Sequence, residues 1–302
     1  MRSGFGNNQA AFDRKRYSLV MHLPRSSQLT SRLEWRESAG STNLELIQLA
    51  GSEVLPDFTV YVTANQIAGR GRSGRVWETP ANSALAISVL IHPPISSGSD
   101  LGKLGWLPLI AGLAMSNAVK ALIGDGQKTI GLKWPNDVLV NERKICGVLT
   151  ELVGNSVVIG AGINLTQTQE QLPIPNATSL AIEGAAGFSG QYLNIDGPAG
   201  IFDTVLSNYL ENLKELYTRF ANLGMDAVAS GVRQQVIDGC ITLGREVRAE
   251  LPGGDTRLGK AVAIDDSGRL VLQVEESNAV TNAPPAKSLL AVSAGDIVHL
   301  RH

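Results

Sequence analysis

The chain has 302 residues, with 26 Lys and Arg, 28 Asp and Glu, and a formal net charge of -2. Hydrophobic residues make up 43% and charged residues 18%, which excludes a disordered chain, and the small net charge argues against a general nucleic-acid binder. Two cysteines, Cys146 and Cys240, exclude a disulfide framework or a four-thiolate zinc site. No apolar run approaches the ~20 residues of a membrane helix. We therefore expect a soluble, cytoplasmic protein of about two domains, at ~100–200 residues per domain.

The N-terminal segment differs in composition from the rest of the chain. Residues 1–36 are rich in Arg and poor in acidic residues, and no apolar run is followed by a small-residue cleavage site, so a secretory signal is not expected. An organelle transit peptide is one interpretation; a surface extension with a short helix near Phe12–Leu23 is the other, and we favour it. We predict that residues 1–32 form an N-terminal extension, too short for a DNA-binding helix-turn-helix domain.

The first predicted elements follow this extension. A short strand is expected at 33–37, and Thr42 with Glu45 fits a capping box, which predicts a helix start. The β-branched segment 59–64 predicts a strand. Residues 67–82 are rich in Gly and Arg and predict a loop. Residues 84–91 are apolar apart from Ser88, as in a strand buried on both faces.

Periodicity also organises the middle of the chain. Apolar residues at spacings of three or four, with Pro108 in the first turn, predict a helix over 104–123. Strands are expected at 129–133, 138–140, 144–153 and 157–164, with a hairpin turn at 141–143. Residues 166–198 predict a loop, and helices are expected at 201–221 and 226–236.

The last part of the chain, from Cys240, changes character again. Short strands are expected at 246–251, 258–264, 270–274 and 288–292, with turns at 252–254 and 265–268. Short strands at regular spacing are typical of a small barrel. We therefore place a domain boundary near residue 238.

Residues 69–76 form a glycine–arginine loop that reads GRGRSGRV. It matches G-x-G-x-x-G, but Pro80 follows where a dinucleotide site needs a helix, and no kinase motif accompanies it. The glycines allow close backbone approach, and guanidinium groups pair with carboxylate and phosphate. The loop therefore suits a carboxylic acid activated by ATP; the alternative is a solvated basic loop.

Two further segments carry polar residues at the ends of strands. In KWPND, at 133–137, Pro135 restricts the turn, Asn136 could read an adenine edge, and Asp137 could hold Mg²⁺. Lys144 begins the next strand, and we expect Lys133 and Lys144 near the glycine–arginine loop. An ordinary Asx turn and a surface lysine are the alternatives.

The segment VVIGAGIN, at 157–164, combines an apolar strand with two glycines and a terminal asparagine. Glycines in a strand let another group approach its backbone, and Asn164 could face a ligand. The alternative is a buried strand whose glycines only make room for a neighbouring element.

Taken together, these segments resemble the biotin protein ligase family. The matching motifs are STN at 41–43, Gln66 with GRGRSGRVW, KWPNDVLV, RKICGVL and IGAGINL, and the likeness continues through LPGG and SAGDIVHL. The resemblance implies an α+β fold: a mixed β-sheet with flanking helices on one side, related to class II aminoacyl-tRNA synthetases, over residues 33–237. A small SH3-like β-barrel would follow over 238–302.

The resemblance also implies a two-step reaction. Biotin and MgATP would form biotinyl-5′-AMP and pyrophosphate, and the biotinyl group would then pass to a lysine of a biotin carboxyl carrier domain, such as that of acetyl-CoA carboxylase. The implied ligands are therefore biotin, ATP and Mg²⁺. We expect a monomer or homodimer that binds neither specific DNA nor a membrane.

Site residues follow from the resemblance by motif. Biotin binding is assigned to Ser41, Thr42, Asn43, Gln66, Gly69, Arg70, Lys144 and Gly147. ATP or adenylate binding is assigned to Arg72, Arg75, Trp77, Asn136 and Asn164. The catalytic candidates are Lys144, Arg70 and Asp137, and Asp137 is also the metal candidate.

Two other functions compete with this hypothesis. A lipoate protein ligase shares the catalytic fold, but the complete arginine loop and the spacing of KWPND and RK favour biotin. A small-molecule sensor or inactive homologue is the non-enzyme alternative, and the intact Arg70, Arg72, Asp137 and Lys144 argue against it. Cys146 stands where the family has a small apolar residue, and we expect it to be buried and not nucleophilic.

Overall fold

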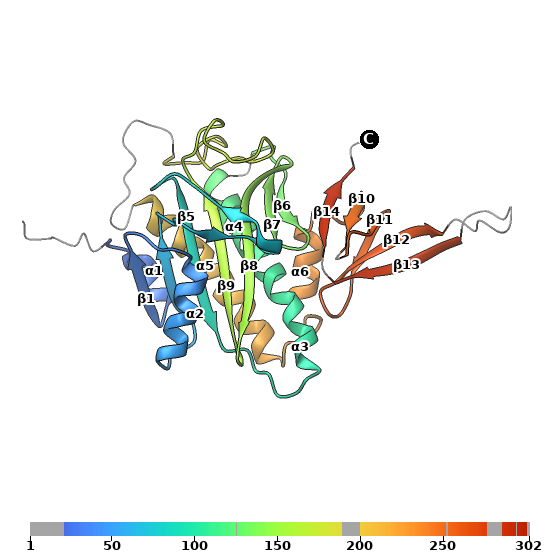
Figure 1. The fold of residues 1–302 in the computed structure, drawn as a ribbon, viewed down its shortest axis with the longest axis horizontal. Coiled ribbons are helices and arrows are strands. Elements are labelled where there is room, and N and C mark those ends of the chain that lie inside the picture. The colour runs from blue at the N-terminus through green and yellow to red at the C-terminus, as the bar shows by residue number, and fades with distance from the viewer. Residues whose placement is uncertain are drawn as a thin grey trace, which may run out of the picture.

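The computed structural model describes residues 21–124, 126–188, 200–251, 253–276, 286–293 and 295–300. Most of the helix expected near Phe12–Leu23 lies outside these residues, as do the end of the 166–198 loop and Pro252 in the 252–254 turn. The described chain forms a larger sheet with helices and a smaller antiparallel sheet beside it (Figure 1).

The larger sheet is mixed, as expected. Only β1 and β2 pair in parallel among its described strands, and every other neighbouring pair is antiparallel. Each strand expected before residue 165 is present, within two residues of its expected ends. In spatial order the strands are β1 (Arg32–Arg36), β2 (Thr59–Thr63), β5 (Ala84–Ile91), β9 (Ser156–Asn164), β8 (Arg143–Val153), β7 (Asp137–Val140) and β6 (Ile130–Lys133).

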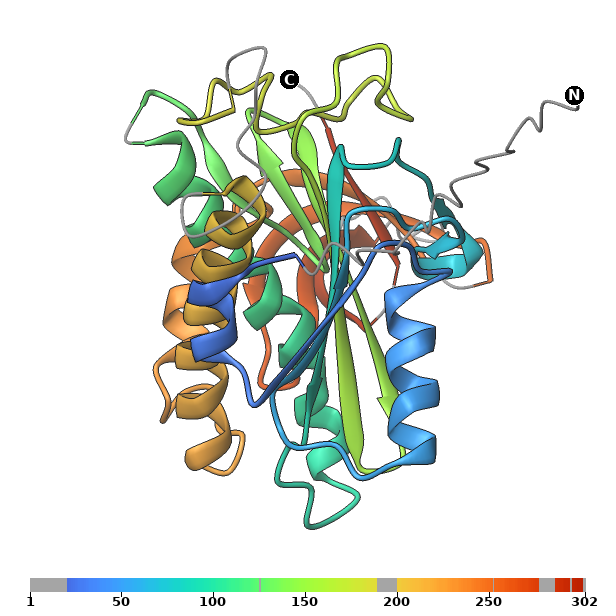
Figure 2. The same ribbon diagram turned by 90° about the vertical axis from the view of Figure 1, so that its left-hand side faces the viewer.

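Helices cover both faces of this sheet, whereas the resemblance implied helices on one side. Figure 2 shows α2 (Thr42–Ser52) alone on one face, where Leu46 anchors a small separate core. The other helices pack around the main core on the opposite face: α1 (Pro24–Leu29), α3 (Asp100–Lys103), α4 (Leu107–Ile123), α5 (Ile201–Asn222) and α6 (Val232–Gly239), with the 3₁₀ turn η2 (Leu104–Trp106) before α4.

The stretch Asp100–Ile123 differs from the expectation that no segment is long and apolar enough to form a membrane helix. Among the described residues it alone is long and apolar enough to cross a membrane by those criteria. However, 72% of its most apolar window is buried inside the protein. Its apolar character is that of a core helix, because α4 packs between the sheet and α5.

Two helix starts differ from the pattern in the sequence. Helix α2 begins at Thr42, but Ser41 is its N-cap and makes no side-chain cap bond. Glu45 accepts from the N–H of Gly40, the residue before the N-cap, at 2.5 Å, so the predicted capping box does not form. Helix α6 begins at Val232 instead of 226, because the Asp226 carboxylate accepts from two following N–H groups and closes a turn.

The C-terminal strands form one antiparallel sheet in the order β13-β12-β11-β10-β14. The segment SAGDIVHL supplies β14, which periodicity did not predict as a strand. A bulge between Ala261 and Ala263 interrupts the pairing of β11 with β12. The strands are β10 (Glu246–Glu250), β11 (Thr256–Ile264), β12 (Leu270–Glu276), β13 (Ala286–Val292) and β14 (Asp296–His299).

A turn of the C-terminal part, at 265–268, packs into the part of the chain that forms the larger sheet. The buried indole N–H groups donate to its backbone: Trp106 to the Asp266 carbonyl at 2.8 Å and Trp134 to the Gly268 carbonyl at 3.0 Å. A Cβ at Gly105 would lie 2.3 Å from the Ser267 carbonyl oxygen. The two parts of the chain therefore share one continuous core.

Candidate active site

A cavity of about 530 Å³ lies on the sheet face that α2 covers. Its wall comes from α2, the glycine–arginine loop, the KWPND turn, strands β8 and β9, and the C-terminal strand β14. The predicted site residues gather around it: Ser41, Thr42, Asn43, Gln66, Arg70, Arg72, Arg75, Trp77, Asn136, Asp137, Lys144, Gly147 and Asn164. Gly69 lies behind the wall instead, where a Cβ would come within 2.4 Å of the Gln66 amide nitrogen.

Three glycines open the sheet surface under this cavity. Gly147 of β8 pairs with Gly162 of β9. A Cβ at Gly160 would lie 2.3 Å from the Asn43 amide oxygen, and one at Gly162 would lie 2.8 Å from the Trp77 indole. Because residues two apart on a strand share a face, Gly160 and Gly162 both make room on the cavity side. The side chains that they admit line the cavity themselves.

One end of the cavity is a network of neutral polar groups. The Thr42 N–H donates to the Gln66 amide oxygen at 2.9 Å, and the Thr42 hydroxyl lies 3.1 Å from the same oxygen. The Ser88 hydroxyl lies 2.6 Å from the Asn43 amide oxygen and 2.8 Å from the Thr42 hydroxyl. Hydroxyls and amides both donate and accept, so this end suits a neutral ligand that does the same.

Ser88 and Glu151 do not line the cavity but bond to the side chains of Thr42 and Asn43 at this end, and neither was predicted. The Glu151 carboxylate accepts from the Asn43 amide at 2.7 Å and lies 3.7 Å from the Arg70 guanidinium. It therefore joins the neutral network to the glycine–arginine loop. The one signal for Ser88 is that it is the single polar residue in an otherwise apolar strand; Glu151 carried no comparable signal.

The glycine–arginine loop is a short hairpin and not an irregular loop. Strands β3 (Gly69–Arg70) and β4 (Val76–Trp77) pair antiparallel around the 3₁₀ turn η1 (Arg72–Gly74). The turn needs left-handed backbone at Ser73, with φ of 56°, and at Gly74, with φ of 74°. The hairpin holds the Trp77 indole over β8 and β9.

Two arginines of this loop contact other parts of the chain. Arg72 donates to the Asn136 amide oxygen at 3.0 Å and to the Gly295 carbonyl at 3.5 Å. Arg75 forms an ion pair with Asp296. Burial lowers the pKa of Arg72 from its ordinary value. The C-terminal part is therefore bound to the arginine loop by Arg72 and Arg75, and the two together close one side of the cavity.

Lys144 lies at the centre of the charged end. Its ammonium is 2.7 Å from the Asp137 carboxylate and 5.6 Å from the centre of the Trp77 ring. A Cβ at Gly147 would lie 3.1 Å from this ammonium, so Gly147 makes room for it. The structure therefore brings together both catalytic candidates that the KWPND and RK motifs predicted.

A β-bulge gives Lys144 this position. Lys144 pairs with Leu139 while Cys146 pairs with Val138, which leaves Ile145 as an extra residue in β8. Lys144 and Gly147 are three apart and would face opposite sides of a regular strand. The extra residue brings them to one side, and bulges commonly re-aim side chains in this way.

A second hollow of about 1150 Å³ continues from the charged end toward the C-terminal sheet. It shares Lys133, Asp137 and Lys144 with the first cavity and adds Arg245 and His299. Burial lowers the pKa of Lys133. Lys133 was expected nearby but was absent from the predicted site set. The second hollow is therefore mixed in charge: it places Lys133, Lys144 and Arg245, which could contact phosphates, beside three carboxylates, those of Asp137, Glu142 and Glu246.

The two predicted asparagines use their amides within the protein. Asn136 donates to the Val148 carbonyl at 2.6 Å while accepting from Arg72. Asn164 donates to the Thr178 carbonyl at 2.9 Å and accepts from Gln167 at 3.1 Å. Both side chains line the cavity, but the hydrogen bonds that would read a base are made to the chain itself.

Cys146 is fully buried in the sheet. Burial raises the pKa of its thiol well above the ordinary value, because the charged thiolate is disfavoured away from water. A nucleophilic cysteine needs the thiolate. Cys146 is therefore a buried small hydrophobe, as expected.

Replacing Gly160 by alanine should damage the neutral end of the cavity. The new methyl group would meet the Asn43 amide, which must then leave Ser88 or Glu151. Losing one such hydrogen bond costs about 1 kcal/mol, so biotin, the ligand that the resemblance implies, should bind roughly fivefold more weakly. Calorimetric titration of biotin measures this, with Gly51→Ala as a control because a Cβ there meets nothing. Equal affinities for the wild type and Gly160→Ala would contradict the assignment.

Comparisons with known proteins support the same family. Residues 39–166 match the Biotin/lipoate A/B protein ligase family, and residues 242–300 match the Biotin protein ligase C terminal domain. The chain is 36% identical over 275 residues to the biotin–[acetyl-CoA-carboxylase] ligase of Mycobacterium tuberculosis, which covers 88% of this chain and 90% of that relative. It is 31% identical over 255 residues to the bifunctional ligase/repressor BirA of Bacillus subtilis, which covers 81% and 70%.

A solved structure agrees with these matches. The biotin protein ligase from Aquifex aeolicus in complex with biotin and ATP has a TM-score of 0.64 and 25% identity, over 89% of this chain and 100% of that one. The α+β fold with a C-terminal antiparallel sheet is the expected one. The chain therefore belongs to the biotin protein ligase family.

Proposed function

We propose that this chain catalyses ATP-dependent biotinylation of one lysine on a biotin carboxyl carrier domain, through biotinyl-5′-AMP. The observation that carries the proposal is the division of one cavity into a neutral hydrogen-bonding end and a charged end around Lys144 and the arginine loop, with the Arg70–Glu151 ion pair between them. Biotin has the same division, because its ureido ring is neutral and polar and its carboxylate is charged. The relatives from M. tuberculosis and A. aeolicus support biotin, ATP and a carrier protein as the substrates.

In the first step the chain would bind and orient both substrates. Ser41, Thr42, Asn43 and Gln66 would hold the ureido ring, and Arg70 and Lys144 would hold the carboxylate against the α-phosphorus of ATP. Because the attack concentrates negative charge, a fixed ammonium lowers the barrier by electrostatics and positioning. Lys133 and Arg245 line the adjoining hollow, where the departing pyrophosphate would lie.

In the second step the carrier lysine would attack the mixed anhydride. The arginine hairpin and Trp77 would cover the adenylate and exclude water until the amine arrives. Asp137 lies next to Lys144 on the cavity wall and would orient the incoming amine or take its proton. Arg72, Arg75, Asn136 and Asn164 would hold the adenylate in place.

Mg²⁺ would enter with ATP. No group of three or more His, Cys, Asp and Glu side chains is placed to hold a metal among the described residues. A single carboxylate with substrate phosphates is a donor set that Mg²⁺ uses, and Asp137 fits that part. Mg²⁺ would then neutralise charge on the leaving pyrophosphate.

Replacing Asp137 by asparagine should raise the Mg²⁺ concentration needed for half-maximal adenylation. We expect about a tenfold increase, equivalent to ~1.4 kcal/mol of binding free energy. The measurement is a Mg²⁺ titration of pyrophosphate exchange at saturating biotin. A fall in kcat with an unchanged Mg²⁺ dependence would remove Asp137 as the metal ligand and leave it a role with Lys144 alone.

Biotin-dependent exchange of pyrophosphate into ATP tests the proposed function directly. Exchange with biotin and none with lipoate is expected, since lipoate lacks the ureido ring that the neutral end would bind. Exchange with lipoate alone would favour a lipoate protein ligase. Absence of exchange with either acid would favour a small-molecule sensor or an inactive homologue.

The remaining properties are part of the same proposal. We propose a catalytic domain at 33–237 and a C-terminal domain at 238–302, a division that separates the matches at 39–166 and 242–300. We propose a soluble cytoplasmic monomer or homodimer without a repressor function or membrane attachment. Tight, sequence-specific DNA binding in a gel shift would contradict the absence of a repressor function.

A further inference from the structure

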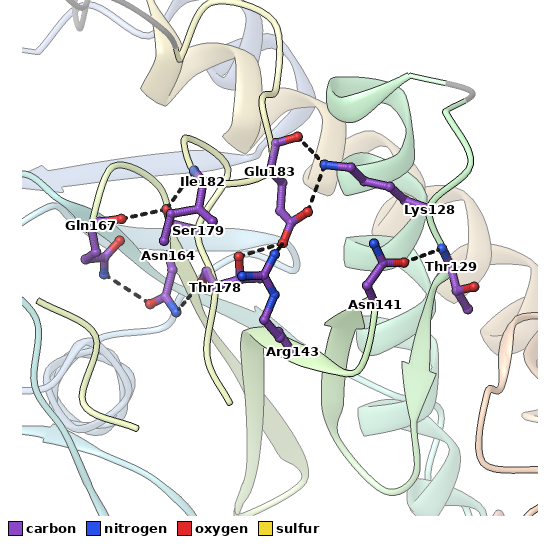
Figure 3. Close-up of polar contacts among 10 residues, drawn as sticks. All are labelled: Lys128, Thr129, Asn141, Arg143, Asn164, Gln167, Thr178, Ser179, Ile182 and Glu183. Carbon is purple, nitrogen blue, oxygen red and sulfur yellow. Dashed lines mark hydrogen bonds and ion pairs between the residues drawn. The ribbon is translucent and has the colours of Figure 1, made fainter. Parts of the chain in front are cut away.

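Glu183 is a buried acid in the segment that follows β9. Its carboxylate lies 2.6 Å from the Thr178 hydroxyl, 2.6 Å from the Arg143 guanidinium and 2.8 Å from the Lys128 ammonium (Figure 3). The Glu183 side chain is 1% exposed, whereas Lys128 and Arg143 are 30% and 35% exposed. A buried charge is costly unless it is paired and hydrogen-bonded, so the carboxylate holds these three groups firmly in place.

Two of these three partners flank the backbone of Lys144. Arg143 directly precedes Lys144 in the chain. The Thr178 N–H donates to the Lys144 carbonyl at 2.8 Å, and the Lys144 N–H donates to the Asn176 carbonyl at 2.7 Å. The segment 176–178 therefore lies along the bulged start of β8 as an extra strand-like partner, with an isolated parallel bridge from Lys144 to Ala177.

The bulge makes this support necessary. An irregular register weakens the ladder locally, and a side chain aimed by a bulge depends on what fixes the backbone there. The segment 176–178 fixes Lys144 on the side away from Leu139. Glu183 in turn fixes that segment through Thr178 and fixes the start of β8 through Arg143.

The same segment also holds Asn164. The Asn164 amide donates to the Thr178 carbonyl, and the Ser179 hydroxyl donates to the Gln167 carbonyl at 2.7 Å (Figure 3). By contrast, Lys128 lies just before strand β6, and its ammonium donates to both the carboxylate and the backbone carbonyl of Glu183. Within the described part of the chain, Lys128 therefore stabilises Glu183 and forms no hydrogen bond or ion pair with Lys144 or residues 176–178.

We propose that Glu183 is a positioning residue, which aims Lys144 into the cavity by holding Arg143, the residue before Lys144, and Thr178, whose N–H bonds the Lys144 carbonyl. This inference rests on the proposed adenylation activity. Glu183 does not line the cavity and lies outside the residues that the resemblance assigned. Its loss should therefore slow the chemical step while leaving the biotin contacts near α2 intact.

The test compares three single variants and one double variant by pyrophosphate exchange. Glu183→Gln keeps the shape and removes the charge, and Thr178→Val removes one hydroxyl with little change in volume. Each should lower kcat roughly tenfold or more, as expected for a small misplacement of a catalytic group, with KM for biotin changed by less than about twofold. The double variant should fall no further than the worse single variant, because both act on one contact.

Lys128→Met is the matched control. It removes an ion pair of the same carboxylate, so it should lower the melting temperature while kcat stays near the wild-type value. If kcat of Glu183→Gln and Thr178→Val were also near wild type at a temperature where they are folded, Glu183 would be structural only. Equal losses of kcat in all three variants would overturn the inference as well. Absence of exchange in the wild-type protein would instead defeat the proposed function itself.

Discussion

Replacement of Lys144 by methionine should lower kcat for adenylate formation by about 10²–10³-fold, the range found when one fixed charge-stabilising donor is removed from an active site. The ammonium lies 2.7 Å from Asp137 and directly over Gly147, so it occupies a fixed point on the cavity wall. Methionine keeps most of the side-chain length and loses the charge. Pyrophosphate exchange measures the first step alone and so isolates the loss.

The fold should survive this substitution. Lys144 contributes its backbone to the sheet and to the segment 176–178, and methionine retains both. The melting temperature should therefore stay close to that of the wild type. Lys120→Met, at an exposed position on α4, controls for a general loss of positive charge. Normal turnover by the Lys144 variant would remove Lys144 from the active site.

Arg72→Gly should release the reactive adenylate before the carrier lysine arrives. Arg72 ties the hairpin to the KWPND turn through Asn136 and to the C-terminal part through Gly295. Hydrogen bonds from a charged group contribute about 1.5–3 kcal/mol, so losing the shorter one alone should speed hairpin opening at least tenfold. The escaping mixed anhydride would then label lysines on bystander proteins.

The release rate of radiolabelled biotinyl-5′-AMP measures this effect, and labelling of added serum albumin reports its consequence. Arg72→Lys is the informative partner variant. It keeps one positive charge but loses the planar fork that reaches two acceptors, so its release rate should lie between the other two. No rise in bystander labelling by Arg72→Gly would contradict the role of Arg72 in closing the hairpin.

The strands and long helices were predictable because their patterns are local. Residues 84–91 are apolar on both faces and form β5, and the spacing after Pro108 identifies α4. The predictions were wrong where a polar side chain has several possible hydrogen-bond partners in the folded protein. Thr42 fits a cap by sequence, but its hydroxyl forms hydrogen bonds with the side chains of Gln66 and Ser88 instead. Such a choice depends on residues distant in the chain.

The clustering of the candidate site residues was predictable where they form compact motifs and not where they occur singly. The motifs placed Lys144, Asp137 and the arginine loop around one cavity, as the structure has them. Glu151 and Glu183 carry no local pattern, since each is one acid in an ordinary segment. Glu151 contacts Arg70, which is 81 residues away in the sequence, and Glu183 contacts Arg143, which is 40 residues away. Only the fold brings such residues together.

The turn at 265–268 has a consequence for how the protein unfolds. It fills space beside Gly105 and accepts from the buried indoles of Trp106 and Trp134. Separating the C-terminal sheet would therefore expose both tryptophans and leave their N–H groups without partners in the core. Because separation destabilises both parts of the chain, they should unfold in a single cooperative transition, which calorimetry measures. Tryptophan fluorescence should change at the same temperature.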